Sequence, residues 1–524
     1  MTEVDPPGPA GLFDPADPAD GPVDATDPAD APVDPADPTG PVDALAALDL
    51  PPQIAAAAAR ALGDDAAEQV AADPWRLLAA PQLRPDQVDR YARARLGTAR
   101  PDDRRRLSGL VCWVLARAGL DGHTVTPTQK IGLALQGFGV GDRAPAVEAA
   151  LAGGRVVDDP AGLSLPAYAV LEEDLADAIA AFVTGGGRLR LEVRQPGGTG
   201  GPDPDTSADA AAAVVLRDAA ALGYEQLTTV LAGLPETAAL ILTGDPAELP
   251  PFPGPGQPFA DLVGSGLFPA GSDGQAADSA IAEAPSAGAP ATTIAELAAA
   301  VRTGVLPAVA ATDRQVVVVG ASDAGDVARR VGQLVTDSIP RVLGHPAEAI
   351  QVVTPAHRGL AGTAALNRAL KERLNPGPGR YEGFDPGDRV VCVASSEVTG
   401  LAAGQHGVVV KDAPGALVVD VDGEQVEVPL DELDGFRHGW AVTVQRAHGR
   451  HWPAVVAVLP AESVGHADRP LVYTALTRAT EHLTAISDAG PAVRQAVALR
   501  GGRPRRTRLI ALLRERLADL TEPD

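Results

Sequence analysis

Lysine is almost missing from this chain of 524 residues. Only Lys130, Lys371 and Lys411 occur, and none of them directly follows a glycine. A phosphate-binding loop of the GK[ST] type needs this pair, because the lysine neutralises the phosphates that the glycine-rich backbone cradles. The sequence therefore excludes a nucleotide site of this type.

Aromatic residues, cysteines and long apolar runs are also scarce. Aromatics make up 3% of the chain, so few rings are available for stacking on nucleic-acid bases. Cys112 and Cys392 lie far apart in apolar runs, which indicates buried thiols in a reducing compartment. No run of eighteen apolar residues occurs and the N-terminus is acidic, so we expect a cytoplasmic protein without signal peptide or membrane contact.

Acidic residues are abundant, and they are concentrated at one end. The net charge is −26, and residues 1–47 hold eleven acids without a single lysine or arginine. This segment repeats DPAD units, a composition that predicts a disordered tail. The tail is either a solubilising segment or an arm that binds a partner or mimics DNA. Because the rest of the chain is also acidic, contacts with nucleic acid would depend on local arginine clusters.

Composition and hydrophobic periodicity divide the chain into further segments. Together they predict a multidomain α/β protein with a helical N-terminal module. The predicted segments are a helical module over 48–183, a linker rich in Gly, Pro and Asp over 184–213, a first α/β unit over 214–312, a second over 313–384 and 438–500, an inserted small β-barrel over 385–437, and a basic C-terminal helix over 501–524.

The first α/β unit carries the clearest motif. In residues 214–268 a strand, a helix and a second strand are followed by GDPAELPP, which resembles motifs II and III of superfamily 1 DNA helicases, most closely the RecD-like branch. Other segments resemble that family in the expected order. They are ADPWRLL (72–78), GHTVTP (122–127), LSLPAYAVLEEDLA (163–176), the motif IV region (339–367), the motif V region (440–456) and LVYTALTRAT (471–480).

The resemblance implies a fold. RecD-like helicases have a helix-hairpin-helix module and two RecA-like domains of the P-loop NTPase type, with an SH3-like barrel inserted in the second. Between Val183 and Val214 there is too little chain for the first strand, the phosphate loop and the units that follow it in the family. The first RecA-like domain is therefore expected to be truncated, and the loop GGTGGPD (197–203) copies only the glycines of a phosphate site.

The resemblance also implies the residues of a nucleotide site, and several are changed. The magnesium-binding acid of motif II falls on Arg217, and the motif III glutamine falls on Glu248. A cation at the metal position would repel the metal. The residues that match the family's catalytic positions are thus read as vestigial: Asp218, Asp245, Glu248, Arg358 and Arg478. The nucleotide-binding positions would be Gly244, Asp245, Arg358, Gly449 and Arg478. Arg478 is alternatively a structural partner of Asp245 or Glu248, and His448 with His451 is not expected to bind a metal.

Contacts with DNA are expected to be modest. The hairpin turn over residues 81–85 has no glycine, and its prolines remove backbone donors that would meet a phosphate. Candidate DNA-binding residues are Arg84, Arg90 and Arg93 in the helical module, and Thr354, Thr443, Arg446 and Thr474 in the second α/β unit. The alternative is that the arginines of the module form a solvated face.

The sequence thus predicts a RecD-like homologue that has lost ATP hydrolysis and acts as a DNA-binding or regulatory factor in DNA metabolism. We expect no cofactor and no metal, and single-stranded DNA as partner, which would place the protein at the nucleoid when bound. One alternative is an active ATP- and Mg²⁺-dependent helicase that tracks single strands. The other is a scaffold that captures a protein partner with its acidic tail.

Overall fold

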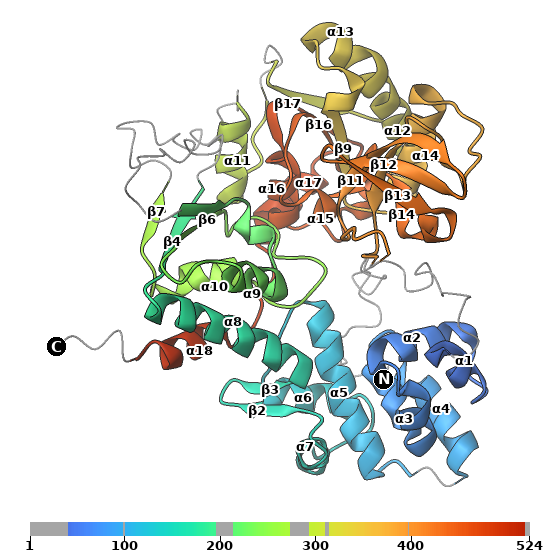
Figure 1. Ribbon diagram of the computed structural model, residues 1–524, viewed down its shortest axis with the longest axis vertical. Coiled ribbons are helices and arrows are strands. Elements are labelled where there is room, and N and C mark those ends of the chain that lie inside the picture. The colour runs from blue at the N-terminus through green and yellow to red at the C-terminus, as the bar shows by residue number, and fades with distance from the viewer. Residues whose placement is uncertain are drawn as a thin grey trace, which may run out of the picture.

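The computed structural model describes residues 40–97, 100–194, 213–272, 293–309, 314–396 and 398–518. Figure 1 shows a helical module, a first α/β half beside it, and a second α/β half that carries an additional antiparallel sheet. The predicted tail over 1–47 lies outside the described residues except for its end, where the first helix already begins at Pro41. None of the described helices combines the length and apolar character that crossing a membrane requires.

The helical module follows the predicted pattern. Asp73 accepts a hydrogen bond from the Trp75 amide and so begins a 3₁₀ turn, and Asp103 begins α5 in the same way. Its elements are α1 (Pro41–Ala46), α2 (Pro52–Leu62), α3 (Ala66–Ala72), η2 (Pro74–Ala79), α4 (Pro85–Leu96), α5 (Arg104–Leu120), α6 (Thr128–Gln136), α7 (Ala144–Ala152) and α8 (Pro166–Thr184), with three short strands β1 (Val125–Thr126), β2 (Val157–Asp159) and β3 (Gly162–Ser164).

Side chains of the module itself occupy the space at the turn between η2 and α4. Leu83 is buried, and its carbonyl accepts a hydrogen bond of 2.7 Å from Trp113 Nε1. Trp75 Nε1 donates to Asp89, which also pairs with Arg106. The indole of Trp113 therefore holds the turn against α5, and the indole of Trp75 connects η2 to Asp89 of α4.

The first α/β half is a four-stranded parallel sheet in the order β5-β6-β4-β7. The predicted linker over 184–213 is wrong for residues 188–193, because they form β4 in the interior of this sheet. Leu189 and Leu191 of β4 are buried, whereas Arg188 and Arg190 are exposed. This alternation is typical of a strand, but the strand is short and glycine-rich segments flank it. The elements are β4 (Arg188–Val193), β5 (Ala213–Leu216), η3 (Ala219–Ala221), α9 (Tyr224–Ala232), β6 (Ala239–Gly244), α10 (Pro258–Ser265) and β7 (Ala270–Ser272).

The C-terminal helix returns to this first half. It is shorter than the predicted segment 501–524 and forms α18 (Leu509–Arg516), which packs on α8 and α10 (Figure 1). Leu509, Leu512 and Leu513 are buried in the core of the first half. Residues far apart in the sequence thus complete one core.

The second α/β half is a five-stranded parallel sheet in the order β15-β9-β16-β17-β8. Helix α11 (Ile294–Arg302) packs into its core, although the sequence assigned this segment to the first unit. The other elements are β8 (Val316–Gly320), α12 (Ala324–Gln333), η4 (Leu334–Ser338), α13 (Ile339–Leu343), η5 (Ala347–Ala349), β9 (Ile350–Thr354), α14 (Thr363–Leu374), β15 (Ala441–Thr443), α15 (Val444–Ala447), β16 (Trp452–Val458), η7 (Ala461–Ser463), α16 (Arg469–Leu476), β17 (Ala479–Ser487) and α17 (Ala492–Leu499).

A five-stranded antiparallel sheet interrupts this half between α14 and β15, where the sequence predicted a barrel. Its order is β13-β12-β11-β10-β14, and it has its own small core around Leu417 and Val428. Its elements are β10 (Arg389–Cys392), β11 (His406–Ala413), β12 (Ala416–Val421), β13 (Glu424–Pro429), η6 (Leu430–Gly435) and β14 (Phe436–His438).

Candidate functional site at the interface of the two halves

The carboxyl ends of three parallel strands meet at one edge of the first half. Arg194 follows β4, Asp218 lies just after β5, and Asp245 follows β6. The pairing of Val193 with Gly244 in the sheet places the first and last of these ends side by side. Ligands of open α/β sheets bind at this edge, so the arrangement marks the candidate site.

A buried ion pair joins this edge to the second half. Glu248 of the loop after β6 pairs with Arg478, which lies between α16 and β17, and the two side chains are 3% and 0% exposed. His448 Nε2 lies 3.1 Å from the other oxygen of Glu248. Burial raises the pKa of this carboxyl, but Arg478 and His448 outweigh it and hold the pKa well below its usual range.

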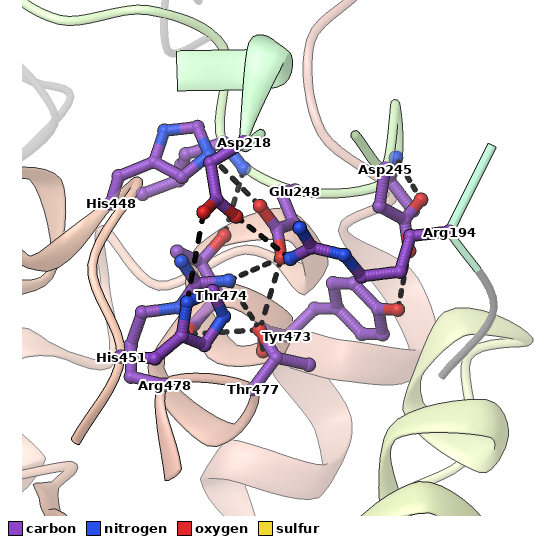
Figure 2. Close-up of polar contacts among 12 residues, drawn as sticks. Arg194, Asp218, Asp245, Glu248, His448, His451, Tyr473, Thr474, Thr477 and Arg478 are labelled. Atoms are coloured by element: carbon purple, nitrogen blue, oxygen red, sulfur yellow. Dashed lines mark hydrogen bonds and ion pairs between the residues drawn. The ribbon is translucent and has the colours of Figure 1, made fainter. Parts of the chain in front are cut away.

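Hydrogen bonds within the second half also hold the Arg478 side chain in place. Its Nε donates to the Thr474 carbonyl at 3.0 Å, and Nη2 donates to Thr477 Oγ1 at 3.0 Å. Figure 2 shows these groups together with the histidines on one side and Asp245 on the other. The guanidinium is therefore held within the protein and does not project into solvent.

Asp218 is the centre of a second group of charges. It accepts a hydrogen bond of 2.7 Å from Arg194 Nη1, and His451 Nδ1 lies 3.7 Å from its other oxygen. Burial, with the nearby Arg478 and despite Asp218, lowers the pKa of His451 to about 4. Asp218 has a φ of 53°, a left-handed conformation that aspartate tolerates better than most residues.

Asp245 makes the third connection between the halves. Its carboxylate accepts a hydrogen bond of 2.5 Å from the Tyr473 hydroxyl and lies 3.5 Å from Arg302 Nη1. Burial raises the pKa of Asp245, and burial also raises that of Tyr473. Beside it, the Leu249 amide donates to Thr474 Oγ1 at 2.8 Å. The motif III loop is thus bonded directly to α16.

The described residues of this interface do not provide the groups that would bind a triphosphate with its magnesium ion. The two acids nearest the centre, Asp218 and Glu248, are each paired with an arginine of the protein, and Arg217 is exposed. A triphosphate needs uncompensated cations and a metal-binding acid. Within the described part of the chain no group of three His, Cys, Asp or Glu side chains is placed to hold a metal ion. We therefore derive no catalytic step through nucleotide or metal.

The structure brings most of the predicted nucleotide residues to this interface. Asp218, Asp245, Glu248 and Arg478 join the cluster, and Gly244 ends β6 beside them. Gly449 has a φ of 81°, and a Cβ there would lie 3.1 Å from Ala221, so glycine lets the second half approach the first closely. Arg358 instead is exposed on the loop between β9 and α14. The loop 197–203 lies outside the described residues.

Several members of the cluster were not predicted. Arg194 was assigned to a linker, although the alternating pattern RLRLEV before it is typical of a strand. His451 was considered only as a metal ligand. Arg302 and Tyr473 had no signal in the sequence, because their partners lie in the other half of the protein.

The predicted DNA-binding residues fall into two places. Arg84 is the N-cap residue of α4 and Arg90 lies on this helix; both are exposed and lie near Asp86, at 3.0 and 3.8 Å. Arg93 is exposed on the same helix. In the second half the threonines are buried and their hydroxyls are used within the protein. Thr354 donates to the Ala361 carbonyl, Thr443 accepts from the Arg446 amide, and Thr474 accepts from Leu249.

A separate cavity of about 620 Å³ lies between α14 and the inserted sheet, and we call it the α14 groove. Thr443 and Arg446 line it, so two of the predicted DNA-binding residues border this groove. Among its other lining residues are His357, Asn367, Arg368, Lys371, Glu372, Val391, Arg437, His438, Ala441 and Val442.

Comparisons with known proteins agree with the arrangement of motifs. Residues 41–125 match the family described as the ATP-dependent RecD2 DNA helicase HHH domain, and residues 438–486 match the UvrD-like helicase C-terminal domain. The chain is 37% identical over 191 residues to the ATP-dependent RecD2 DNA helicase of Deinococcus radiodurans. This match covers 36% of the chain and about a quarter, 26%, of that relative's length.

Solved structures of Pif1 helicases are also similar. The Bacteroides Pif1 helicase in complex with ADP-AlF3 and single-stranded DNA matches at 10% identity with a TM-score of 0.31, over 66% of this chain and 97% of that one. Pif1 from Candida albicans matches at 12% identity with a TM-score of 0.30, over 59% and 76% of the two chains.

Proposed function

Since the chain belongs to the RecD-like family of superfamily 1 DNA helicases, we propose that it is a member without ATP hydrolysis that serves as a DNA-binding or regulatory factor. The observation that carries this proposal is the pairing of Glu248 with Arg478 across the interface of the two halves. An arginine that stabilises a transferred phosphate must be available to it. Here the arginine neutralises a carboxylate of the protein instead.

The charges around this pair support the same proposal. Arg194 neutralises Asp218, so the acid that follows β5 is also occupied by a cation of the chain. The chain has no lysine after a glycine that could take the place of a phosphate-loop lysine. A nucleotide that binds Arg478 would have to break its buried pair with Glu248, and leaving this carboxylate buried without a partner costs roughly 3–5 kcal/mol.

Binding to DNA is proposed from two features. The relative that is 37% identical over 191 residues is named a DNA helicase, and the α14 groove carries arginines and polar side chains of the kind that contact phosphates. The net charge of −26 opposes association with a polyanion, so binding should be modest and should weaken steeply with salt.

The first experiment measures magnesium-dependent ATP hydrolysis by the full chain, with and without single-stranded DNA. Arg478→Ala serves as the background control, and the exposed Arg341→Ala serves as a matched arginine control. We expect no turnover above that of Arg478→Ala. Turnover that DNA stimulates, and that Arg478→Ala alone abolishes, would refute the proposal.

An active ATP-dependent helicase is the second candidate. It is favoured by the name and activity of the relative that is 37% identical over 191 residues. In this case the two halves would have to separate and a phosphate site would have to come from another part of the protein or from a partner. The same hydrolysis measurement distinguishes the two candidates.

A further inference from the structure

A group of cations lies where the segment between α17 and α18 crosses the helical module. Two hydrogen bonds fix the segment there: the Thr124 amide donates to the Arg506 carbonyl at 2.9 Å, and the Arg506 amide donates to His123 Nδ1 at 3.0 Å. The charges of Lys130 on α6 and of Arg503 and Arg506 in the segment all act on the His123 imidazole. We call His123 and these three cations the basic junction.

The cations of the basic junction have no carboxylate partner among the described residues. None of them forms an ion pair within that part of the chain, and Arg506 Nε and Nη2 are buried there without a hydrogen-bond acceptor. The neighbouring Arg505 differs, because it turns inward and donates to backbone carbonyls of the first half. A buried guanidinium without an acceptor is unfavourable, so the junction favours a bound anion.

Two acids lie near the basic junction. Asp121 acts electrostatically on Arg506, and Asp468 acts on Arg503, but neither forms an ion pair with these arginines in the described chain. Asp468 instead accepts a hydrogen bond of 3.0 Å from the Leu471 amide at the start of α16. The three cations therefore remain available to a ligand in a protein whose net charge is −26.

His123 adds a neutral donor to this group. Its Nδ1 accepts the hydrogen bond from the Arg506 amide, so the ring proton lies on Nε2. Burial, together with the charges of the surrounding cations, lowers the pKa of His123 to about 4, and the imidazole is therefore neutral at pH 7. Within the described residues Nε2 has no hydrogen-bond partner, and the side chain is half-buried, so this N–H can donate to a ligand.

We propose that the basic junction binds phosphate groups, which either a DNA backbone or a free polyphosphate could supply. Guanidinium and ammonium groups neutralise phosphate oxygens, and an imidazole N–H in a fixed orientation adds a hydrogen bond. The choice of DNA as the source rests on the proposed function. The residues of the junction differ from those that line the α14 groove, so DNA bound here would contact the helical module and the C-terminal segment at a second place.

The experiment measures binding of the full chain to a fluorescent single-stranded oligodeoxythymidine between about 50 and about 200 mM salt. Lys130→Gln/Arg503→Gln removes two cations of the junction and leaves its buried Arg506 in place. Arg494→Gln/Arg514→Gln is the matched control, because it removes two positive charges from exposed positions of α17 and α18.

The junction variant should bind about tenfold or more weakly at about 100 mM salt. Its plot of log affinity against log salt should be less steep by about 1.4, because each phosphate contact with a single strand contributes about 0.7 to the slope. The control variant should keep the affinity and slope of the unchanged chain. If DNA binds and the two double variants have equal affinities and slopes, the inference is overturned while the proposed function stands.

A probe without DNA separates the two sources of phosphate. The full chain with isotope-labelled histidine is titrated with inorganic pyrophosphate, and sodium chloride at the same ionic strength is the reference. The His123 resonance, identified by its loss in His123→Gln, should shift in the unchanged chain and stay in place in Lys130→Gln/Arg503→Gln. A shift without any DNA binding would identify a free polyphosphate as the ligand and refute the DNA-binding part of the proposed function. If neither probe binds at the junction, the inference itself is wrong.

Discussion

Arg478 shows at the scale of one residue how the interface between the halves is stabilised. Its guanidinium is buried and pairs with Glu248, and removing one partner leaves the other charge buried and uncompensated. We therefore expect Arg478→Met to lower the free energy of unfolding by about 3–5 kcal/mol, as measured by urea denaturation. The double variant Glu248→Gln/Arg478→Met should recover much of this loss, whereas the exposed Arg341→Met should change little. Additive effects of the two substitutions would contradict a direct pairing.

Glu172 of α8 should contribute to the dependence of stability on pH. Burial raises the pKa of its carboxyl to about 7, although Thr124, Tyr224 and the Arg508 amide all donate hydrogen bonds to it. A carboxyl whose pKa is higher in the folded than in the unfolded chain binds its proton more tightly when folded. The contribution of Glu172 to the free energy of unfolding should therefore fall by about 3 kcal/mol as the pH rises from about 4.5 to about 7.

Glu172→Gln tests this expectation, because it removes the titrating proton and keeps the shape of the side chain. When the free energy of unfolding is measured by urea denaturation between pH 4.5 and pH 7, the value for this variant minus that for the unchanged chain should increase by about 3 kcal/mol as the pH rises. Glu225→Gln, at an exposed position of α9, should keep the original slope. The interpretation fails if both variants have the same slope.

At the scale of elements, the segment between α17 and α18 ties three parts of the molecule together. Arg505 Nη1 donates to the carbonyls of Pro251, Gly254 and Gly256 in the first half, and the Thr124 amide of the helical module donates to the Arg506 carbonyl at 2.9 Å. At its other end, Arg500 donates to carbonyls of the second half. The segment therefore spans the interface on a short length of chain.

Arg505→Ala should loosen this connection. Loss of these hydrogen bonds should cost roughly 1–3 kcal/mol locally and raise hydrogen exchange in α18 about tenfold or more. Exchange in α12 and α14 of the second half should be unchanged. Arg514→Ala, an exposed position of the same helix, is the matched control. If both variants exchange alike, Arg505 does not anchor the helix.

The elements also show how far the sequence could predict this structure. Capping residues and apolar spacing located the helices of the N-terminal module and the strands β5 and β6, because these signals are local. The strand β4 was missed, since six alternating residues between glycine-rich flanks have the composition of a linker. The partners of α18 and α11 could not be predicted, because no local pattern says which distant core a short amphipathic helix completes.

The candidate site likewise combines residues that local motifs predict with residues that depend on contacts between distant segments. The family motifs predicted four of the charged residues that meet at the interface: Asp218, Asp245, Glu248 and Arg478. The alternative reading of Arg478 as a structural partner of Asp245 or Glu248 is confirmed for Glu248. The cation beside Asp218 and the hydroxyl group beside Asp245 were not predicted. Arg194 and Tyr473 could be identified only once the two halves were placed against each other.

At the scale of the whole molecule, polar groups join the two halves across their interface, and we call this arrangement the closed state. An ion pair joins Glu248 to Arg478, and hydrogen bonds join Asp245 to Tyr473 and the Leu249 amide to Thr474. A ligand shifts a conformational equilibrium only as far as its affinities for the two states differ. Because the charges of the interface are satisfied within the chain, ATP should have little preference for the closed state.

Hydrogen exchange measured with and without millimolar ATP and magnesium tests this closed state. Peptides that cover residues 244–249 and 448–451 should exchange slowly and equally in both conditions. In Glu248→Ala/Arg478→Ala, the same peptides should exchange faster without nucleotide, because two connections between the halves are lost, while the inserted sheet should remain unchanged. If ATP strongly protects these peptides in the unchanged chain, the interface binds nucleotide and the charge pairs open to admit it. Two halves that stay in contact without nucleotide would instead present one fixed surface to a partner, as the proposed binding or regulatory factor requires.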